Sequence, residues 1–194
     1  ASVVQRFLKD VREGKVKLER PQDRIGALQL VESIDWNGDA VHLVEQCLRD
    51  GNGQVRTRAL GLMRLYGWQA PTLYGKVWEV VSMAERPLEE RIDAIAAVAM
   101  QDPPHVDGWK ALLAADEVAI VRMTLRTMKQ LAGNDEVKAM LLAVGGQLVK
   151  QDESLKPELT SVLTLFGVDD AERTSMGLTP SLSTVDRSQI MADA

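Results

Sequence analysis

The chain alternates between stretches with apolar residues at helical spacing and short breaks rich in Gly, Pro, Asn and Asp. Apolar residues recur every three or four positions within each stretch, as in a helix with one buried face. No stretch alternates apolar and polar residues with the period of two that a half-buried strand needs. The pattern predicts an all-α protein of ten helices joined by short turns, at 2–14, 22–35, 40–50, 54–66, 71–85, 87 to the Pro103-Pro104 break, 105–115, 118–132, 135–150 and 155–166.

The predicted helices repeat in pairs with a period of about 33 residues. The helix at 54–66 has a counterpart 66 residues later, where Val121-Arg122 and Gly133 match Val55-Arg56 and Gly67. One register aligns the second helix of every pair, with a basic residue at Arg24, Arg56, Arg91, Arg122 and Lys156. Apart from Ser33, small or apolar residues follow three, six and nine positions later: Ala27 and Leu30; Ala59, Leu62 and Leu65; Ala94, Ala97 and Met100; Leu125, Met128 and Leu131; Leu159, Val162 and Leu165. Because one pair has too little apolar surface to fold alone, stacked pairs are expected to bury these positions in a continuous core.

The turns between the paired helices carry acids in the central repeats. These acids stand six residues before the basic position, in the pairs Asp50/Arg56, Glu85/Arg91 and Asp116/Arg122. Leu18 and Lys150 occupy the same place in the end repeats. Each acid is expected to accept hydrogen bonds from the arginine of the following helix or of a neighbouring repeat, forming a ladder.

The clearest repeats run from Asp50 to Gly67 and from Asp116 to Gly133, each with a turn acid, Val-Arg, small and apolar residues, then Leu and Gly. This pattern resembles the HEAT and HEAT-like (PBS-lyase-type) repeats, and the resemblance covers roughly residues 3–167. It is weakest at 150–167, where Lys156 replaces the arginine. The resemblance implies a right-handed α-solenoid of five stacked helix pairs within a domain at 1–167, whose second helices line a concave face that binds proteins.

Residues 168–194 differ in composition, because 174–188 are rich in Ser and Thr and poor in large apolar side chains. We expect a polar, extended C-terminal tail that docks on the solenoid or on a partner. Leu178, Leu182 and Ile190 are the residues expected to make that contact. Docking on the same chain and docking on another chain both remain open.

Charge and composition narrow the class of partner. The net charge of −5 and the pI of about 5.2 disfavour nonspecific binding to nucleic acid and favour solubility. No run approaches the roughly 18 apolar residues of a membrane span, so no membrane insertion is expected. The single cysteine, Cys47, forbids an internal disulfide and is expected to be a buried thiol. The chain begins at Ala1, so processing or a longer parent protein is open; we favour the cytoplasm and leave a secreted or periplasmic mature form open.

The residues that catalysis or metal binding would require are sparse. His42 and His105 are the only histidines, and neither lies in a His-Glu-x-x-His motif or near cysteines at zinc spacing. HEAT-like iron hydroxylases carry paired His-Glu motifs, which are absent from this sequence. We therefore predict no catalytic residue, metal or cofactor. The predicted function is a non-enzymatic scaffold, or a structural subunit of a larger complex, that binds proteins.

The candidate partner-binding residues fall into two groups. Positions two, five and eight after the basic residue are expected to line the concave face and include Arg58, Arg64, Asp93, Thr124, Thr127 and Gln130. Trp36 and Trp68 occupy equivalent places just beyond helix ends, where an indole either anchors an interface or covers the helix end. Trp78 and Trp109 share a position in the first helices, and we interpret both as fillers between layers.

Two other functions fit the repeat type. One is a DNA glycosylase-type enzyme that cradles duplex DNA, for which Trp68, Trp109 and Asp107 would supply the lesion site. The net charge of −5 opposes this interpretation, because a phosphate backbone attracts a basic face. The other is a lyase-like chaperone of a tetrapyrrole-bearing protein, which the repeat type permits and no particular residue demands.

Overall fold

The computed structural model describes residues 2–178, and all regular secondary structure in this part of the chain is helical. It contains eleven α-helices and four 3-10 helices, and no strand occurs among the described residues. The all-α prediction is therefore confirmed. The chain divides into two compact units, residues 1–105 and 106–194, which we call unit 1 and unit 2.

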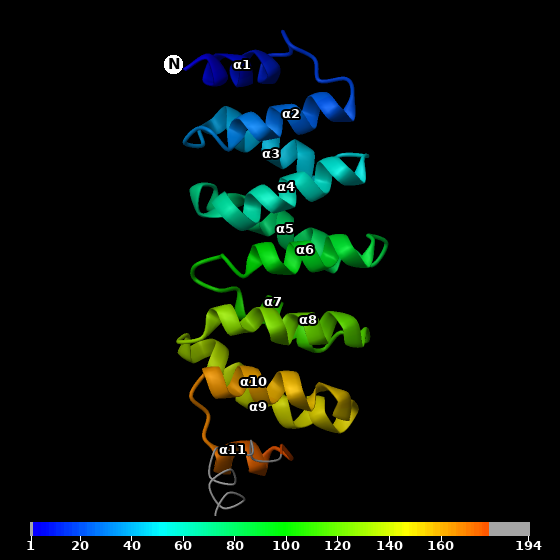
Figure 1. Cartoon of the computed structure of the whole chain (residues 1–194), viewed down its shortest axis with the longest axis vertical. Helices are drawn as coiled ribbons and strands as arrows, with labels where there is room; N and C mark the ends of the chain where they lie inside the picture. The colour runs from blue at the N-terminus through cyan, green and yellow to red at the C-terminus, as the bar shows by residue number, and fades with distance from the viewer. Residues whose placement is uncertain (1, 179–194) are drawn as a thin grey trace, which may run out of the picture. The chain divides into compact units, whose positions relative to one another are not determined.

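Unit 1 consists of two layers of helices (Figure 1). Along one layer α1 packs on α3 and α3 on α5, while along the other α2 packs on α4 and α4 on α6. Contacts between α3 and α4 and between α5 and α6 join the layers. The bounds are α1 Val3–Arg12, α2 Pro21–Val31, α3 Gly38–Leu48, α4 Gly53–Tyr66, η1 Gly67–Gln69, η2 Pro71–Leu73, α5 Tyr74–Ser82 and α6 Leu88–Val98.

Unit 2 repeats this arrangement on a smaller scale. Here α7 packs on α9, α8 packs on α10, and the contacts α7–α8 and α9–α10 join the layers. The bounds are α7 Val106–Leu113, α8 Val118–Met128, η3 Lys129–Leu131, α9 Asp135–Gln151, η4 Glu153–Leu155, α10 Lys156–Leu165 and α11 Asp170–Ser175. Several helices are shorter than their predicted ranges. The last turn of the predicted helix at 118–132 is the 3-10 helix η3, and α2 and α5 end early, at Val31 and Ser82.

Helix α11 lies in the segment that composition assigned to the tail. Val168 and Leu178, on either side of it, are 2% exposed. The guanidinium of Arg173 is also buried and donates to the hydroxyl of Thr164 at 3.0 Å and to the carbonyl of Val168 at 2.5 Å. The stretch from Val168 to Leu178 is thus folded onto unit 2.

The repeat register correctly identifies the centre of each second helix but not its end. Three residues after the basic position, all five predicted core residues are at most 2% exposed: Ala27, Ala59, Ala94, Leu125 and Leu159. Nine residues after it, Leu131 is buried, whereas Leu65, Met100 and Leu165 are exposed. The prediction of a stripe buried along the whole helix is wrong at these three positions and at Leu30, which is 39% exposed. All four residues lie within two residues of the C-terminal end of their helix.

The basic position has a structural role in unit 1. Arg24 and Arg56 each donate to the backbone carbonyl six residues earlier, those of Leu18 and Asp50, at 2.9 and 2.8 Å. Arg24 also contacts the carboxylate of Asp50 in the next repeat, with an Nε–Oδ2 distance of 2.6 Å. Each arginine therefore ties the loop before its helix to the neighbouring repeat.

The acid ladder predicted from the turn residues is only partly correct. Asp50 accepts from a neighbouring repeat's arginine, as expected. Arg56 instead contacts Glu90 within helix α6. In unit 2, Arg122 contacts Glu158 within α10. Glu85 and Asp116 are exposed turn residues. The role predicted for the turn acids, pairing with an arginine, is taken at Arg56 and Arg122 by glutamates of the neighbouring helices.

Candidate protein-binding edge

Four large apolar side chains of unit 1 are exposed along one edge. They belong to Leu30, Leu65, Trp68 and Met100, which are 39%, 60%, 68% and 47% exposed. Each lies within two residues of the C-terminal end of α2, α4 or α6. We call these four residues the apolar edge. Elsewhere in the described part of unit 1, Val3 and Leu88 are the exposed large apolar residues, and both lie near helix N-termini.

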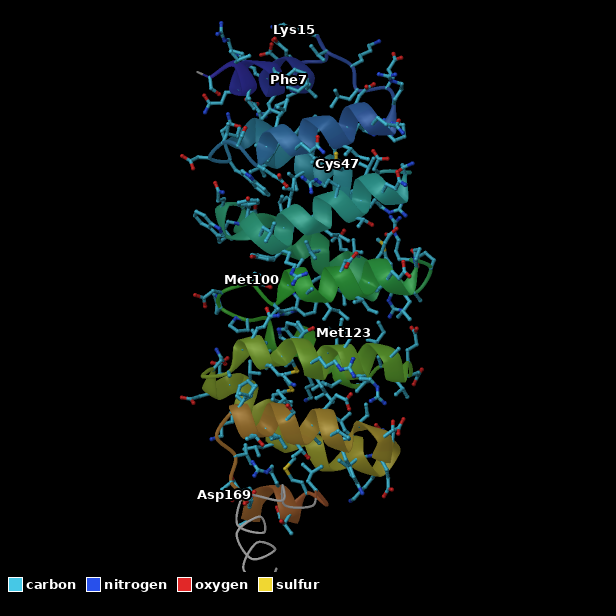
Figure 2. The ribbon with its side chains drawn as sticks, in the orientation of Figure 1. Phe7, Lys15, Cys47, Met100, Met123 and Asp169 are labelled. Atoms are coloured by element: carbon cyan, nitrogen blue, oxygen red, sulfur yellow. The ribbon has the colours of Figure 1, made fainter. Side chains whose placement is uncertain are left out.

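The second-layer helices bring the apolar edge together. Helices α2, α4 and α6 end on the same side of unit 1, at the left of Figure 1, and Figure 2 labels Met100 there. Packed helices lie about 8–10 Å apart, so side chains at three successive ends extend over roughly 20 Å. Large apolar patches on a folded surface often mark interaction sites, whereas single exposed apolar side chains are common.

Trp36 and Gln69 fix the loops that carry the edge. The backbone amide of Trp36, after α2, donates to the side-chain oxygen of Gln69, after α4, at 2.9 Å. The rings of Trp36 and Tyr66 lie 6.3 Å apart at an angle of 46°. Trp36 is thus a half-buried support that joins two successive loops, which matches the helix-end interpretation of this residue, whereas Trp68 projects outward.

Gly67 sets the turn that exposes Trp68. Sequence alone treats Gly67 like Gly133 and Gly167, but those two have φ of +100° and +72° while Gly67 has φ of −56°. Gly67 is required for space instead, because a Cβ there would stand 2.8 Å from the Tyr74 hydroxyl and 3.0 Å from the Met63 methyl group. The tightly packed glycine and the Trp36–Gln69 hydrogen bond hold the turn in one conformation before any partner arrives.

The face predicted to be concave is only partly exposed in unit 1, and its charged residues have neighbours of opposite charge. Arg58 contacts Glu32 on the neighbouring helix, with an Nη2–Oε1 distance of 2.5 Å. Arg64 and Asp93 are both exposed and interact electrostatically. Partial desolvation raises the pKa of Asp93, Arg64 opposes this shift, and Glu89 and Glu90 add to it. The charges on this face alternate in sign between neighbouring helices, so the face offers no field of one sign to a charged ligand.

Three predicted concave-face residues lie in unit 2, and two of them are inaccessible. Thr124 is fully buried and Thr127 is 6% exposed. The Thr124 hydroxyl donates to the Ile120 carbonyl one turn earlier at 2.7 Å. The prediction that these threonines line an accessible surface is wrong, because neighbouring side chains cover both of them. Gln130, at the end of this helix, is exposed.

Of the three tail residues predicted to make a docking contact, Leu178 lies within the described part of the chain. Leu178 is buried in unit 2, and its backbone amide donates to the Arg173 carbonyl at 3.1 Å. Leu182 and Ile190 lie outside the described residues.

Cys47 and the tryptophans of the first helices have structural environments. Cys47, inside α3 (Figure 2), is 1% exposed. Burial raises its pKa to about 12, with Asp50 adding and Arg24 opposing. It lines a hollow of about 320 Å³ beside Arg24. Trp109 is fully buried, which confirms its interpretation as a filler. The indole of Trp78, which is half-buried, donates to Gln101 at 2.8 Å and meets His105 edge to face at 5.3 Å.

The burial of Trp109 bears on the glycosylase alternative. A residue at 0% exposure cannot stack on a base without repacking α7, so one of the three residues that favour this interpretation is lost. Within residues 2–178 no three His, Cys, Asp or Glu side chains gather as metal ligands would. None of the helices described here has the length and apolar character needed to cross a membrane.

Sequence reasoning selected Trp36 and Trp68 but missed Leu65, Leu30 and Met100 as surface residues. The register placed all three in the core, because their spacing continues the buried stripe. The signal that could have separated them is proximity to the helix end, since Leu65 comes just before the turn at Gly67. Near a helix end, a stripe residue is buried only where another element covers it, as at Leu131.

No family model matches this chain, and no curated protein matches it significantly.

Proposed function

We propose that this protein is a non-enzymatic protein-binding scaffold or a structural subunit of a larger complex, and that it holds a protein partner through the apolar edge of unit 1. The observation that carries the proposal is the exposure of Trp68 and Leu65, at 68% and 60%, on a turn whose conformation is already fixed. A rigid turn loses little conformational entropy on binding, so less of the gain from burying these side chains is lost to ordering the turn.

The energetic argument favours a protein partner with an apolar groove. Fully burying a leucine side chain gains about 1.5–3 kcal/mol, and a tryptophan at the centre of an interface often contributes 2 kcal/mol or more. Trp68 and Leu65 are three residues apart in the sequence, and both side chains are exposed for contact with a partner. The apolar edge thus replaces the concave face as the favoured binding surface.

The charges near the apolar edge favour a largely uncharged contact. Arg58 is paired with Glu32, and Arg64 lies near Asp93. Partner binding should therefore change little between low and moderate salt, because few exposed charges would be neutralised. A nucleic acid would instead lose affinity steeply as salt rises.

The right-handed solenoid of five helix pairs belongs to this proposal as well. Its support within unit 1 is the packing of each helix on the helix two places further along, and unit 2 has the same packing order. Arg24 and Arg56, which contact Asp50 and Glu90 in the next repeat, supply a reason for such stacking.

Site-specific photocrosslinking in extract of the source cells tests the function. A benzophenone amino acid replaces Trp68 in one variant of the full chain and Val118, exposed in unit 2, in the control. We expect a protein adduct from position 68 and none of the same mass from position 118. The adduct should disappear when Leu65→Asp is added, because a carboxylate cannot enter an apolar groove without a large desolvation cost.

Two results would reject the proposal. One is the absence of any adduct at position 68 under conditions where a control scaffold crosslinks. The other is an adduct that survives Leu65→Asp, since contact would then not depend on the apolar edge. An adduct with twice the mass of the chain would identify the partner as a second copy of this protein.

A further inference from the structure

Gly145 lies in the middle of helix α9 and is buried. Glycine inside a helix is less favourable than alanine, so its presence there needs an explanation. A Cβ atom at Gly145 would overlap the terminal methyl carbon of Met176, whereas a Cβ at Gly146, the next residue, would meet no atom within 4 Å. The surface of α9 at Gly145 is therefore a notch that holds the Met176 methyl group.

Met176 follows α11, the short helix that packs against α9 and α10 (Figure 1). A second attachment of this helix is polar. The buried guanidinium of Arg173 donates to the hydroxyl of Thr164 in α10 at 3.0 Å, and to the carbonyl of Val168 at 2.5 Å. Helix α11 has six residues, too few for a stable helix in isolation. Its place on unit 2 therefore depends on attachments such as these two.

The surroundings of the notch are apolar. Two methyl carbons of Leu159, from α10, lie 3.5 and 3.6 Å from the Cβ position of Gly145, and Leu159 is fully buried. The sulfur atom of Met176 is one bond away from the methyl group in the notch. Met176 itself is only partly buried, and local opening of a six-residue helix gives a small oxidant further access to it.

Oxidation changes the chemistry of this side chain. Hydrogen peroxide transfers one oxygen atom to a thioether sulfur and leaves as water, and the product is a methionine sulfoxide. The sulfoxide carries a polar S=O bond next to the methyl group. Burying a polar group without a hydrogen-bond partner costs free energy, and the notch offers the methyl groups of Leu159 and a helix backbone whose amides are already bonded.

We propose that Met176 is a site of reversible oxidation, at which conversion of the thioether to the sulfoxide releases α11 from the notch on α9. The reduced side chain fits the notch and holds the helix in place, whereas the oxidised side chain does not fit. Release uncovers the notch and the side chain of Leu159 beside it, so this apolar surface of unit 2 is accessible only after oxidation. Reduction of the sulfoxide closes the surface again.

Other methionines differ from Met176 in burial or in surroundings. Met63 and Met128 are fully buried, so peroxide has little access to them. Met100, in unit 1, is 47% exposed and should be oxidised readily, but its oxidised sulfur would stay in water. Oxidation of Met100 should therefore leave α11 unchanged, and Met100→Leu is the matched control for Met176→Leu.

Amide hydrogen exchange of the full chain, before and after treatment with hydrogen peroxide, tests the proposal. The amides of Arg173, Met176 and Leu178 donate to carbonyls within the segment and report its attachment. We expect their exchange to accelerate by about tenfold or more when Met176 is oxidised. The acceleration should persist in Met100→Leu, disappear in Met176→Leu, and be reversed by methionine sulfoxide reductases.

Gly145→Ala tests the notch without an oxidant. The added methyl group displaces the methyl group of Met176, so the same amides should exchange faster in the untreated variant. Gly146→Ala is the matched control and should leave their exchange unchanged, because its methyl group meets no neighbour. Alanine favours a helix more than glycine does, so faster exchange in Gly145→Ala would not result from damage to α9.

Four results would overturn the proposal. The first is that peroxide oxidises Met100 in the folded chain and leaves Met176 intact, since the thioether would then be out of reach. The second is complete oxidation of Met176, established by mass spectrometry, with unchanged exchange of the segment. The third is an acceleration that survives Met176→Leu, which would assign the effect to another residue. The fourth is equal exchange in Gly145→Ala and the original chain, because the notch would then not hold α11.

Discussion

The guanidinium of Arg56 donates two hydrogen bonds to the carboxylate of Glu90 on the neighbouring helix, with Nε–Oε2 and Nη2–Oε1 distances of 2.9 and 2.5 Å. The two side chains are only 11% and 7% exposed. A third hydrogen bond, from Nη1 to the Asp50 carbonyl, holds the guanidinium against the loop before its own helix. One side chain thus joins α4, its preceding loop and α6.

Removing one member of this pair should be costly. Arg56→Ala leaves the Glu90 carboxylate buried without its partner, and we expect a loss of about 3–5 kcal/mol in the free energy of unfolding, measured with urea. Arg49→Ala is the control, because its contact with Glu79 is exposed on both sides at 55% and 49%. That variant should change stability by less than about 0.5 kcal/mol. Equal effects of the two variants would contradict the role assigned to Arg56.

Gly67→Ala should destabilise unit 1 through overpacking. The added methyl group meets the Tyr74 hydroxyl and the Met63 side chain, and overpacked cores lose about 1–3 kcal/mol. Gly61→Ala, in the same helix, meets no atom within 4 Å and should stabilise by about 0.5–1 kcal/mol. Adding Tyr74→Phe to Gly67→Ala should recover part of the loss, because the closest atom is removed. Thermal unfolding of the original chain and the three variants measures these changes. If Tyr74→Phe recovers no stability, the clash with the Tyr74 hydroxyl is not the cause of the loss.

Glu158 should make unit 2 sensitive to acid. Burial alone raises the pKa of Glu158, but hydrogen bonds from Arg122 and Arg126 outweigh it, so the folded-state pKa lies below the ordinary 4.5. A carboxyl with a lowered pKa contributes stability that is complete above 4.5 and is lost as pH falls through the folded value. Urea midpoints should therefore fall as the pH drops below about 4.5.

The variant with Arg122→Met and Arg126→Met tests the cause of that dependence. Without the arginines, burial dominates the pKa of Glu158, and the contribution of this group to the pH dependence should reverse sign. Lys156→Met is the matched control, because its contact with Glu153 is largely exposed. If the double variant keeps the acid sensitivity of the original chain, another carboxyl is responsible.

Trp68 should supply most of the fluorescence that acrylamide quenches easily. It is 68% exposed, while Trp109 is fully buried and the other two tryptophans are half-buried. Trp68→Phe should remove the readily quenched component and leave the unfolding free energy within about 0.5 kcal/mol, as for other surface changes. A quenching curve unchanged by Trp68→Phe would mean that the indole is covered.

The sequence by itself determined the helices, their pairing and the buried centres of the second helices, because those features depend on local periodicity. Ala59 and Leu125 are buried as the register requires, and Cys47 is the buried thiol that its place in a helix indicates. The sequence also shows the repeated arginine, but it does not show that the partner of Arg56 is Glu90. Helical spacing fixes which face of a helix is apolar, and the need to cover that face makes the helices pack.

Only the tertiary structure decided where that stripe ends and which charges meet. Leu65 and Leu131 share one register position, yet one is 60% exposed and the other 7%, because neighbouring elements cover different lengths of each helix. Arg56 reaches Glu90 rather than an acid in a turn, because the separation of packed helices, and not distance along the chain, selects its partner. Exposure and ion pairing depend on atoms far away in sequence, so a local pattern cannot specify them.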